Sequence, residues 1–414
     1  MKIKLLGSGD EVGKSCLIVS DKSKGVVLDC GVKLQPEPPT YPRVAGEDIN
    51  ALILSHAHLD HSGAVPTLYR KNKIPAFMND VTFELALLLI KDSMKVGQKQ
   101  GYGVPYSKND LKRFVKSAKI VNYHEKFSAG NFRCSLYPSG HIPGSSSVML
   151  QGSKKVFYTS DIQTLESHLL NPCKLPDKVD TLVIESTYSY KSHPPREIEE
   201  KKLVAAVEEA LAREEAALIP VFAVGRAQEI LLILSDYAGK ISLDGMAKGA
   251  SEIIMSYPRY LKEPEKLRKV LKKVNFVRSQ KDREDALKRN PIIISSAGML
   301  GGGPAISYLR SIRKRPESKV LFCGFLVEES PGRNLIETKI FKTAEEQFDV
   351  HCDVQRFEMS AHADRSGLFK IIEKTRPETV VCVHGEHCRD FAKEISSRFS
   401  INAFAPKDGE EIRV

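Results

Sequence analysis

Short runs of apolar and β-branched residues recur along the chain and alternate with longer stretches of helical periodicity. The runs are VVLD (26–29), ALILSH (51–56), TLVIES (181–186), ALIPVF (217–222), PIIISS (291–296), KVLFCGF (319–325) and TVVCVH (379–384). Between them, apolar residues recur at helical spacing in residues 196–216 and 225–239. Strands that alternate with helices predict an α/β fold whose sheets are largely buried.

Several of the predicted strands end in a polar residue that is able to bind a ligand. In open α/β sheets, ligands bind beyond the carboxyl ends of the strands. The polar residues at these ends therefore predict a functional edge, and they are His56, Glu185, Ser295 and His384.

Residues 7–15, GSGDEVGKS, resemble a phosphate-binding loop but do not match its sequence pattern. That pattern requires a glycine five positions before the Gly-Lys pair, where this chain has Ser8. The acidic Asp10 and Glu11 would repel a phosphate, and the apolar CLIVS that follows continues as a strand. We therefore expect a tight turn between two strands here.

Residues 56–61, HAHLDH, hold three histidines and an aspartate in six positions. His56 and His58 are two positions apart, so on an extended segment their side chains point the same way. Asp60 and His61 follow where the chain is expected to enter a helix. Imidazole and carboxylate together suit a borderline metal such as zinc. Further candidate ligands lie downstream in a glycine-rich turn or at strand ends, namely His141, Asp161 and His384.

Composition and charge narrow the class of partner and the cellular compartment. Lys and Arg total 62 against 52 Asp and Glu, and the net charge of +10 favours an anionic partner, most commonly nucleic acid. The 8 cysteines form no C-x-x-C pair, which predicts reduced thiols in a cytoplasmic protein. No apolar run approaches the ~20 residues of a membrane helix, so we expect no membrane association.

The histidine-rich motif and its downstream partners resemble the metallo-β-lactamase superfamily. ESTY (185–188), SAHAD (360–364) and VHGE (383–386) resemble the three additional motifs of its β-CASP group. That group comprises nucleic-acid-processing nucleases such as ribonuclease J and the endonuclease of messenger-RNA 3′-end formation. DEVGKS (10–15), PVFAVGRAQE (220–229), SSAGM (295–299) and GFLVEESPGR (324–333) are similar to segments of the same group. The resemblance thus covers nearly the whole chain and is nearest to the short archaeal members.

The resemblance implies a metallo-β-lactamase αββα sandwich with an inserted α/β β-CASP domain. We expect the first part of the metallo-β-lactamase domain at residues 1–184, the insert at 185–350 and the returning C-terminal part at 351–414. This division brings His384 back to a site built from residues 56–161. Because the chain begins directly at the first predicted strand, we expect no KH domain in front of it and little sequence preference.

The resemblance also implies two zinc ions per chain. His56, His58, His141 and Asp161 would hold one ion, and Asp60, His61, the bridging Asp161 and His384 would hold the other. Asp29, at the end of VVLD, matches the first motif of the family and would orient these ligands from outside the ligand set. The alternative for Asp29 is a residue that only turns the chain at a strand end.

Two zinc ions of this kind lower the pKa of a shared water toward ~7, which predicts hydrolysis of a phosphodiester by hydroxide. The products would carry a 5′-phosphate and a 3′-hydroxyl. We predict His362 of SAHAD as the acid that protonates the leaving oxygen, because imidazole donates a proton near neutrality. Glu185 would orient His362 or a metal ligand, and Asp60 counts among the catalytic residues as well as the ligands. Purely structural roles are the alternatives for Glu185 and His362.

The expected substrate is single-stranded RNA, which is favoured over DNA by the resemblance alone. Backbone N–H groups of the glycine-rich turn at 295–305 would cradle a phosphate, although a flexible connection explains this turn equally well. The predicted substrate-binding residues are Ser296 and Gly298 of this turn, Arg226, Arg333 and Ser360.

The pattern leaves other functions and partners open. A small-molecule hydrolase acting on a thioester or lactam, and an inactive RNA-binding scaffold, are the alternative functions. Endonucleolytic and 5′-to-3′ exonucleolytic cleavage share the same metal chemistry. The short archaeal relatives suggest a homodimer, and other RNA-processing factors are possible partners.

Overall fold

The structure is a computed structural model that describes residues 1–22 and 24–414. Its residues group into two compact units. The first unit contains residues 1–166, 172–192 and 362–414, and the second contains residues 167–171 and 193–361. The first unit is therefore built from both ends of the chain. The domain boundaries expected after residues 184 and 350 stay predictions.

Within the described residues, the first unit contains two seven-stranded sheets. The first sheet has the order β22 (Glu411–Arg413), β1 (Lys2–Gly7), β2 (Cys16–Ser20), β3 (Gly25–Leu28), β4 (Ile49–Ile53), β5 (Ala76–Met78) and β6 (Ala118–Ile120). The second has the order β21 (Asn402–Phe404), β20 (Thr379–Val383), β11 (Thr181–Glu185), β10 (Lys155–Tyr158), β9 (Ser146–Gln151), β8 (Phe132–Pro138) and β7 (Lys126–Ala129). Both sheets mix parallel and antiparallel pairs. In the first, β22 and β1 to β3 pair antiparallel and β3 to β6 pair parallel. In the second, β7 to β10 pair antiparallel, whereas β10, β11, β20 and β21 run parallel.

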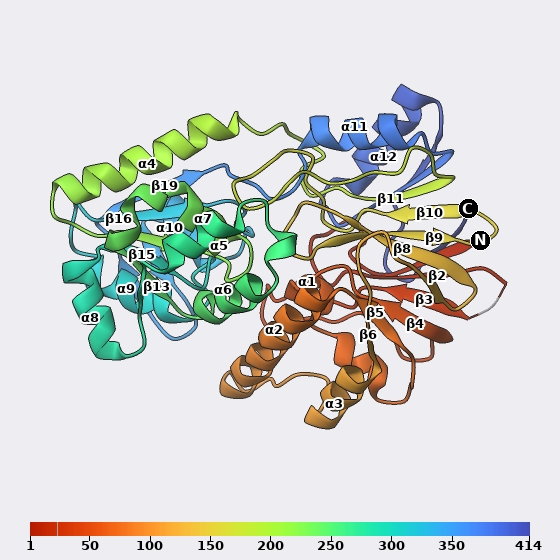
Figure 1. Cartoon of the computed structure of the whole chain (residues 1–414), viewed down its shortest axis with the longest axis horizontal. Helices are drawn as coiled ribbons and strands as arrows, with labels where there is room; N and C mark the ends of the chain where they lie inside the picture. The colour runs from red at the N-terminus through yellow and green to blue at the C-terminus, as the bar shows by residue number, and fades with distance from the viewer. Residues whose placement is uncertain (23) are drawn as a thin grey trace. The chain divides into compact units, whose positions relative to one another are not determined.

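Helices cover the outer face of each sheet, which gives four layers (Figure 1). One outer layer contains α1 (Leu59–Ser62), η1 (Val65–Tyr69), α2 (Asp80–Lys99) and α3 (Lys108–Ser117), and the other contains α11 (Arg365–Thr375) and α12 (Cys388–Phe399). Side chains alternate across β11 and β20, as the pleat of a strand requires. Val183 and Val381 lie in the core between the sheets, whereas Leu182 and Val380 lie in the core under α11 and α12. The arrangement is the αββα sandwich expected from the resemblance.

The second unit is built on a parallel sheet, six-stranded among the described residues. Its order is β14 (Asn275–Phe276), β13 (Ile241–Asp244), β15 (Ile292–Ser295), β12 (Ala217–Pro220), β16 (Lys319–Cys323) and β19 (Asp353–Phe357). α8 (Gln280–Arg289), α9 (Pro304–Ile312) and α10 (Pro331–Thr338) share one core with this sheet. Figure 1 shows α4 (Arg196–Ala212) on the opposite side of the sheet from α8 and α9. The remaining elements are α5 (Arg226–Ile233), η2 (Ser235–Lys240), α6 (Ala247–Ser256), η3 (Pro258–Tyr260), α7 (Pro264–Leu271) and the hairpin of β17 (Ile340–Lys342) and β18 (Gln347–Asp349).

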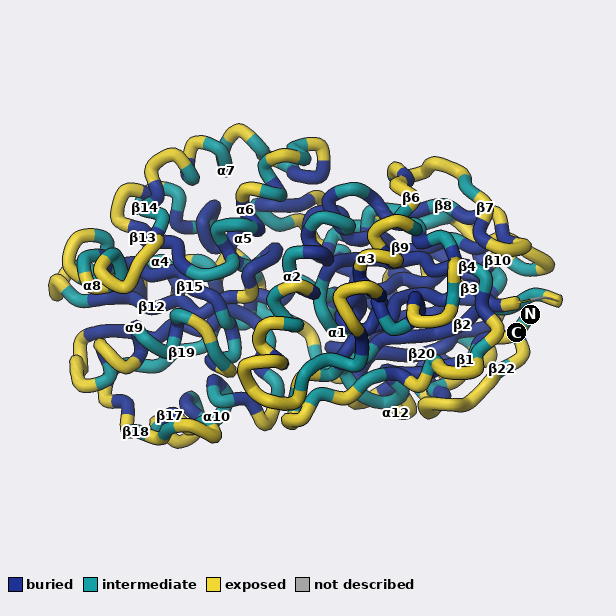
Figure 2. The backbone as a smooth tube through the Cα atoms, turned by 90° about the horizontal axis from the view of Figure 1, so that it is seen from below, coloured by how far each residue is buried: buried dark blue, intermediate teal, exposed yellow. Residues whose placement is uncertain are grey.

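The predicted strands and helices are present. The seven apolar runs correspond to β3, β4, β11, β12, β15, β16 and β20, and the two helical stretches contain α4 and α5. The seven strands lie in the interior of their sheets. Figure 2 shows that the strand backbones are mostly buried and that many of the connecting loops are exposed. Residues 8–15 connect the antiparallel strands β1 and β2, as expected for a turn rather than a phosphate-binding loop.

Two other expectations concern the thiols and membrane helices. Each of the eight cysteines in the chain is a free thiol, and seven of them are buried. Within the described residues, no helix combines the length and the apolar character needed to cross a membrane.

Candidate metal centre

The candidate ligands stand in loops that follow strands of both sheets of the first unit. The segment from His56 to His61 follows β4 of the first sheet and ends in the short helix α1. His141 lies in the turn between β8 and β9 of the second sheet, Asp161 follows β10, and His384 directly follows β20. The two sheets therefore both contribute to one cluster.

Sharp backbone turns bring these side chains to the strand ends. Asp29, Ser160 and His384 have φ angles of 59°, 51° and 54°, in the left-handed region that non-glycine residues rarely adopt. Strained backbone of this kind is concentrated at functional sites. The turn that holds His141 is fixed differently, because the Ser145 hydroxyl accepts a hydrogen bond from the His141 N–H at 3.2 Å.

One group of ligand atoms comes from His56, His58, His141 and Asp161, and these atoms lie within 4.8 Å of one another. His141 Nε2 is 3.1 Å from His58 Nδ1. Asp161 Oδ2 is 3.5 Å from His56 Nε2 and 3.6 Å from His141 Nε2. The side chains thus converge on one point from three separate segments of the chain.

A second group comes from Asp60, His61, Asp161 and His384, again with ligand atoms within 4.8 Å of one another. Asp161 Oδ1 is 3.1 Å from His61 Nε2 and 3.4 Å from His384 Nδ1. Asp60 Oδ2 is 3.4 Å from His384 Nε2. Asp161 belongs to both groups and directs one oxygen toward each.

The residues present fit a divalent metal ion. His56 Nε2 is fully buried and has no hydrogen-bond partner among the described residues, which is costly for a polar atom unless something else binds it. Burial and the neighbouring His61 hold the pKa of His56 well below its usual range, so its imidazole is neutral, as a ligand must be. Burial opposes ionisation of Asp161, but His61 and His384 outweigh it and hold the pKa of Asp161 well below its usual range.

Asp29 lies beneath the cluster and is completely buried. Its carboxylate accepts hydrogen bonds from the N–H and the hydroxyl of Ser55, both at 2.7 Å, and from the Tyr158 hydroxyl at 2.9 Å. Asp29 Oδ2 is also 2.7 Å from Nδ1 of His61. Burial opposes protonation of His61, but Asp161 and Asp29 outweigh it and raise the pKa of His61 well above its usual range. With a metal ion bound, the Nδ1 proton would be donated to Asp29 and Nε2 would be left as the ligand atom, which is how an outer carboxylate orients a ligating histidine.

Other polar residues around the ligands were not predicted from the sequence. Ser55 Oγ lies 3.1 Å from His56 Nδ1, and Ser160 donates to Ser55 Oγ at 2.7 Å. Thr187 Oγ1 lies 3.3 Å from His384 Nδ1. Ser55 and Thr187 lie inside or beside the recognised motifs. Their position in the sequence, next to a candidate ligand or motif residue, could have predicted that they contact the site.

His362 and Glu185 form a separate pair at the side of the cluster. His362 Nδ1 is 3.0 Å from Oε1 of Glu185, and its Nε2 is 4.0 Å from Oδ2 of Asp161. Burial opposes protonation, but the charges of Glu185 and Asp161 outweigh it and raise the pKa of His362 to about 9. The three residues together form a third group with metal-ligand spacing. The imidazole therefore has the charge of an acid and the placement of either a proton donor or a ligand.

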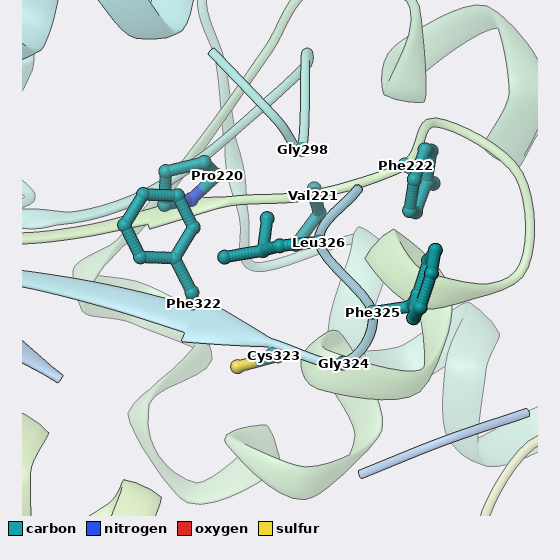
Figure 3. Close-up of a pocket in the computed structure, with 9 residues that line it drawn as sticks. All are labelled: Pro220, Val221, Phe222, Gly298, Phe322, Cys323, Gly324, Phe325 and Leu326. Carbon is teal, nitrogen blue, oxygen red and sulfur yellow. The ribbon is translucent and has the colours of Figure 1, made fainter. Parts of the chain in front are cut away.

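The predicted substrate-binding residues all belong to the second unit. Ser296 Oγ accepts a hydrogen bond from the Ala247 N–H at 3.2 Å. Gly298 lines a small pocket with Pro220, Phe322 and other residues at the carboxyl ends of β12 and β16 (Figure 3). The other three differ in their surroundings: Arg226 begins α5, Arg333 pairs with Glu337 one turn along α10, and Ser360 is buried.

A four-layer sandwich with histidine and aspartate ligands at its strand ends defines a metal-dependent hydrolase of the metallo-β-lactamase type. Three family models match the chain in succession. They are the metallo-β-lactamase superfamily over residues 9–177, the β-CASP domain over 227–335 and the Zn-dependent metallo-hydrolase RNA specificity domain over 348–406.

Relatives that match the whole of this chain agree with these models. The chain is 37% identical to "Probable RNase MJ4" of Methanocaldococcus jannaschii over the whole of both chains. It is 32% identical to "Transcription termination factor FttA" of the same organism, over 100% of this chain and 72% of the relative. This protein belongs to the metallo-β-lactamase superfamily and, within it, to the β-CASP group. A solved structure of a protein of unknown function from Enterococcus faecalis shares the fold with a TM-score of 0.64, 16% identity and 99% of each chain covered.

Proposed function

We propose that this protein is a zinc-dependent ribonuclease that hydrolyses phosphodiester bonds of single-stranded RNA in RNA processing or decay. The products carry a 5′-phosphate and a 3′-hydroxyl. The observation that carries the proposal is the pair of ligand groups that share Asp161. The family model for RNA specificity at residues 348–406 and a full-length relative named as a ribonuclease support RNA as the substrate.

Zinc is the ion that this donor set suits best, because imidazole nitrogen with carboxylate oxygen is its usual coordination in hydrolases. His56, His58, His141 and Asp161 would hold one ion, and Asp60, His61, Asp161 and His384 would hold the second. When bound, two such ions would supply activation of water at neutral pH and stabilisation of charge on the phosphate oxygens. The count of two rests on the shared Asp161, which has one oxygen available for each group.

His362 supplies the proton that the leaving oxygen requires. Glu185 holds Nδ1 of His362 at 3.0 Å, so that Nε2 is the ring nitrogen left to meet the substrate. Glu185 is itself fixed, since its Oε1 accepts the Ile162 N–H at 3.0 Å and its Oε2 the Thr187 N–H at 3.3 Å. Glu185 therefore acts as a positioning residue, and Asp29 plays the same part for His61.

Several finer points belong to this proposal. Ser296, Gly298, Arg226, Arg333 and Ser360 contact the RNA backbone, where the two arginines meet phosphates. The free, mostly buried thiols favour a reducing cytoplasm. Homodimerisation and association with other RNA-processing factors stay predictions.

A digestion of end-labelled substrates tests the function. Single-stranded RNA and DNA of the same sequence, labelled at the 5′ end, are incubated with zinc-loaded protein and the products are sized over time. We expect RNA to be cleaved, with intermediate lengths for endonucleolytic cleavage and released mononucleotides for 5′-to-3′ exonucleolytic cleavage. Hydrolysis of a thioester or lactam without RNA cleavage would favour a small-molecule hydrolase, and RNA binding without cleavage would favour a scaffold. His58→Ala, which removes a ligand, is the inactive control.

A further inference from the structure

Two exposed aromatic side chains, Tyr190 and His387, lie together on the surface of the first unit. Tyr190 is 52% exposed, which is unusual for so large a ring, and His387 is exposed as well. Their ring centroids are 4.8 Å apart with 51° between the ring planes. We call these two residues the outer aromatic pair.

The outer aromatic pair is attached to the metal centre through two adjacent loops. Tyr190 follows β11 and His387 follows β20, and these parallel strands pair directly, with Glu185 opposite Val383. The Ser186 N–H donates to the carbonyl of His384 at 3.2 Å. A Cβ on Gly385 would come within 2.3 Å of the Ser186 carbonyl oxygen, so the loops are in close contact and Gly385 is required there. The pair therefore has a fixed position relative to the ligand His384.

A series of rings runs from the predicted acid to the outer aromatic pair. The ring centroids of His362 and Tyr188 are 6.2 Å apart, and those of Tyr188 and Tyr190 are 6.3 Å apart with planes inclined by only 30°. Tyr188 is buried, whereas Tyr190 and His387 are exposed and the side chain of His362 is 16% exposed. Lys191 Nζ lies 5.4 Å from the Tyr188 ring centroid and adds positive charge beside the series.

Exposed aromatic rings next to positive charge are what proteins use to hold single-stranded nucleic acid, because every base has a face that can stack. A flat apolar surface alone would also suit a protein partner. The net charge of +10 and the direct continuity with the predicted acid favour a polyanion whose phosphate is being cleaved. The alternative to a binding site is a surface tyrosine that contacts a histidine without any function.

We infer that Tyr190 and His387 form a stacking platform for the base of a nucleotide beside the scissile phosphate. This inference rests on the proposed ribonuclease function and adds a positioning site for one base. The site accepts any base, since stacking reads the face and not the edge of the ring. An RNA that lacks the base at this site should therefore bind less tightly, whereas an RNA with a different base there should bind equally well.

The test combines protein variants with RNA that lacks single bases. The cleavage position is mapped on one RNA, the linkage at that position is replaced by a methylphosphonate that resists hydrolysis, and an abasic nucleotide is then moved along the strand. Affinity for the zinc-loaded protein is measured by fluorescence anisotropy. We expect one abasic position near the cleavage site to weaken binding to the wild type by about 5- to 150-fold, the usual effect of losing one stacked base.

The variants show whether that base stacks on Tyr190. Tyr190→Ala is expected to weaken binding of intact RNA by a similar factor and to be insensitive to the abasic nucleotide at that position, whereas Tyr190→Phe keeps the ring and binds like the wild type. Tyr102→Ala is the matched control, since Tyr102 is another exposed tyrosine of the same unit. Thermal unfolding of all three variants checks that the fold is retained.

The outcomes separate the inference from the function on which it rests. If the wild type cleaves RNA while Tyr190→Ala binds it as well as the wild type does, the stacking platform is wrong and the ribonuclease stands. Additive effects of Tyr190→Ala and the abasic nucleotide also overturn the platform, because the two changes would then remove different contacts. If the wild type neither binds nor cleaves RNA, the proposed function falls together with the inference.

Discussion

Replacing His362 with alanine separates proton transfer from metal binding. His362 Nε2 lies 4.0 Å from Asp161 Oδ2, whereas the nitrogens of His61, His56 and His141 approach the Asp161 oxygens to 3.1, 3.5 and 3.6 Å. The contact of His362 with Glu185, at 3.0 Å, leads us to predict that His362 is a proton donor rather than a ligand. We therefore expect His362→Ala to keep its zinc and to lose the proton that the leaving oxygen needs.

The size of the effect follows from the two contacts that the substitution removes. Loss of a general acid lowers the rate about 10²- to 10⁴-fold. Removing the imidazole also takes one partner from the buried Glu185, which costs about 1–3 kcal/mol of stability when a buried acceptor is left short of a donor. Glu185 keeps the Ile162 and Thr187 N–H donors, at 3.0 and 3.3 Å, so the fold should survive. If the rate falls by about 10⁴-fold while the fold is retained, the loss reflects proton transfer rather than unfolding.

The assay is single-turnover cleavage of RNA beside zinc content measured by elemental analysis on the same preparation. His58→Ala should lose zinc and activity together, which calibrates the behaviour of a true ligand. Glu185→Gln should slow cleavage less than His362→Ala and should add little to it in the double variant, because Glu185 acts through His362. If His362→Ala loses zinc in step with its activity, His362 is a ligand, as the third group of Asp161, Glu185 and His362 allows, and the assignment as an acid is refuted.

Four further predictions follow from other parts of the structure. His384→Ala should lower the zinc content from two ions per chain to one, and an unchanged content would rule out the second site. Asp29→Asn should weaken zinc binding about 10- to 100-fold in a chelator competition, because it removes the negative charge 2.7 Å from His61 Nδ1 and replaces one acceptor oxygen with a donor. Tyr158→Phe, which removes one donor to Asp29, should change zinc binding less. Gly31→Ala should disrupt the ligand loop and release zinc, since a Cβ there would lie 1.6 Å from the Asp60 carbonyl oxygen, and Gly239→Ala, with nothing within 4 Å, should be tolerated. The Glu200 hydrogen bond raises the pKa of His168. The stability that this pair gives the second unit is therefore complete below the pKa of about 6.5 in the unfolded chain and is lost as the pH rises through the pKa in the folded protein. Urea unfolding of the wild type and His168→Gln should differ at pH 6 and converge at pH 9.

The sequence predicts the buried strands better than the half-exposed ones. β11 and β20 are apolar at nearly every position because both of their faces are covered, so they stand out as continuous runs. β8 alternates instead, with Phe132 and Cys134 buried and Arg133 exposed between them. A search for short β-branched runs passes over such an alternating strand, whereas β10, which is buried at three of its four positions, was expected as the strand that ends before Asp161.

The candidate ligands were within reach of sequence reasoning because four of them are compressed into six positions. His141, Asp161 and His384 are isolated in the sequence. His141 was found by its place in a glycine-rich turn, Asp161 and His384 by their places at strand ends, and all three by family resemblance. The residues that hydrogen-bond to the ligands or to Asp29 from outside the ligand set could not be found in this way. Tyr158 donates to Asp29 across 129 positions in the sequence, and only the closing of one sheet onto the other brings the two together.

The construction of the centre couples metal binding to the folding of the whole first unit. His61 follows a strand of one sheet, whereas Asp161 and His384 follow strands of the other, so the cluster exists only when the sandwich is closed. β20 pairs with β11 and β22 pairs with β1, which ties the C-terminal segment to both sheets. The closed sandwich buries His56 Nε2 without a hydrogen-bond partner among the described residues, a cost that a bound metal ion would relieve. Metal binding would then contribute to the folding free energy of the unit, since the candidate site joins residues as distant in the sequence as Asp60 and His384, which are 324 positions apart.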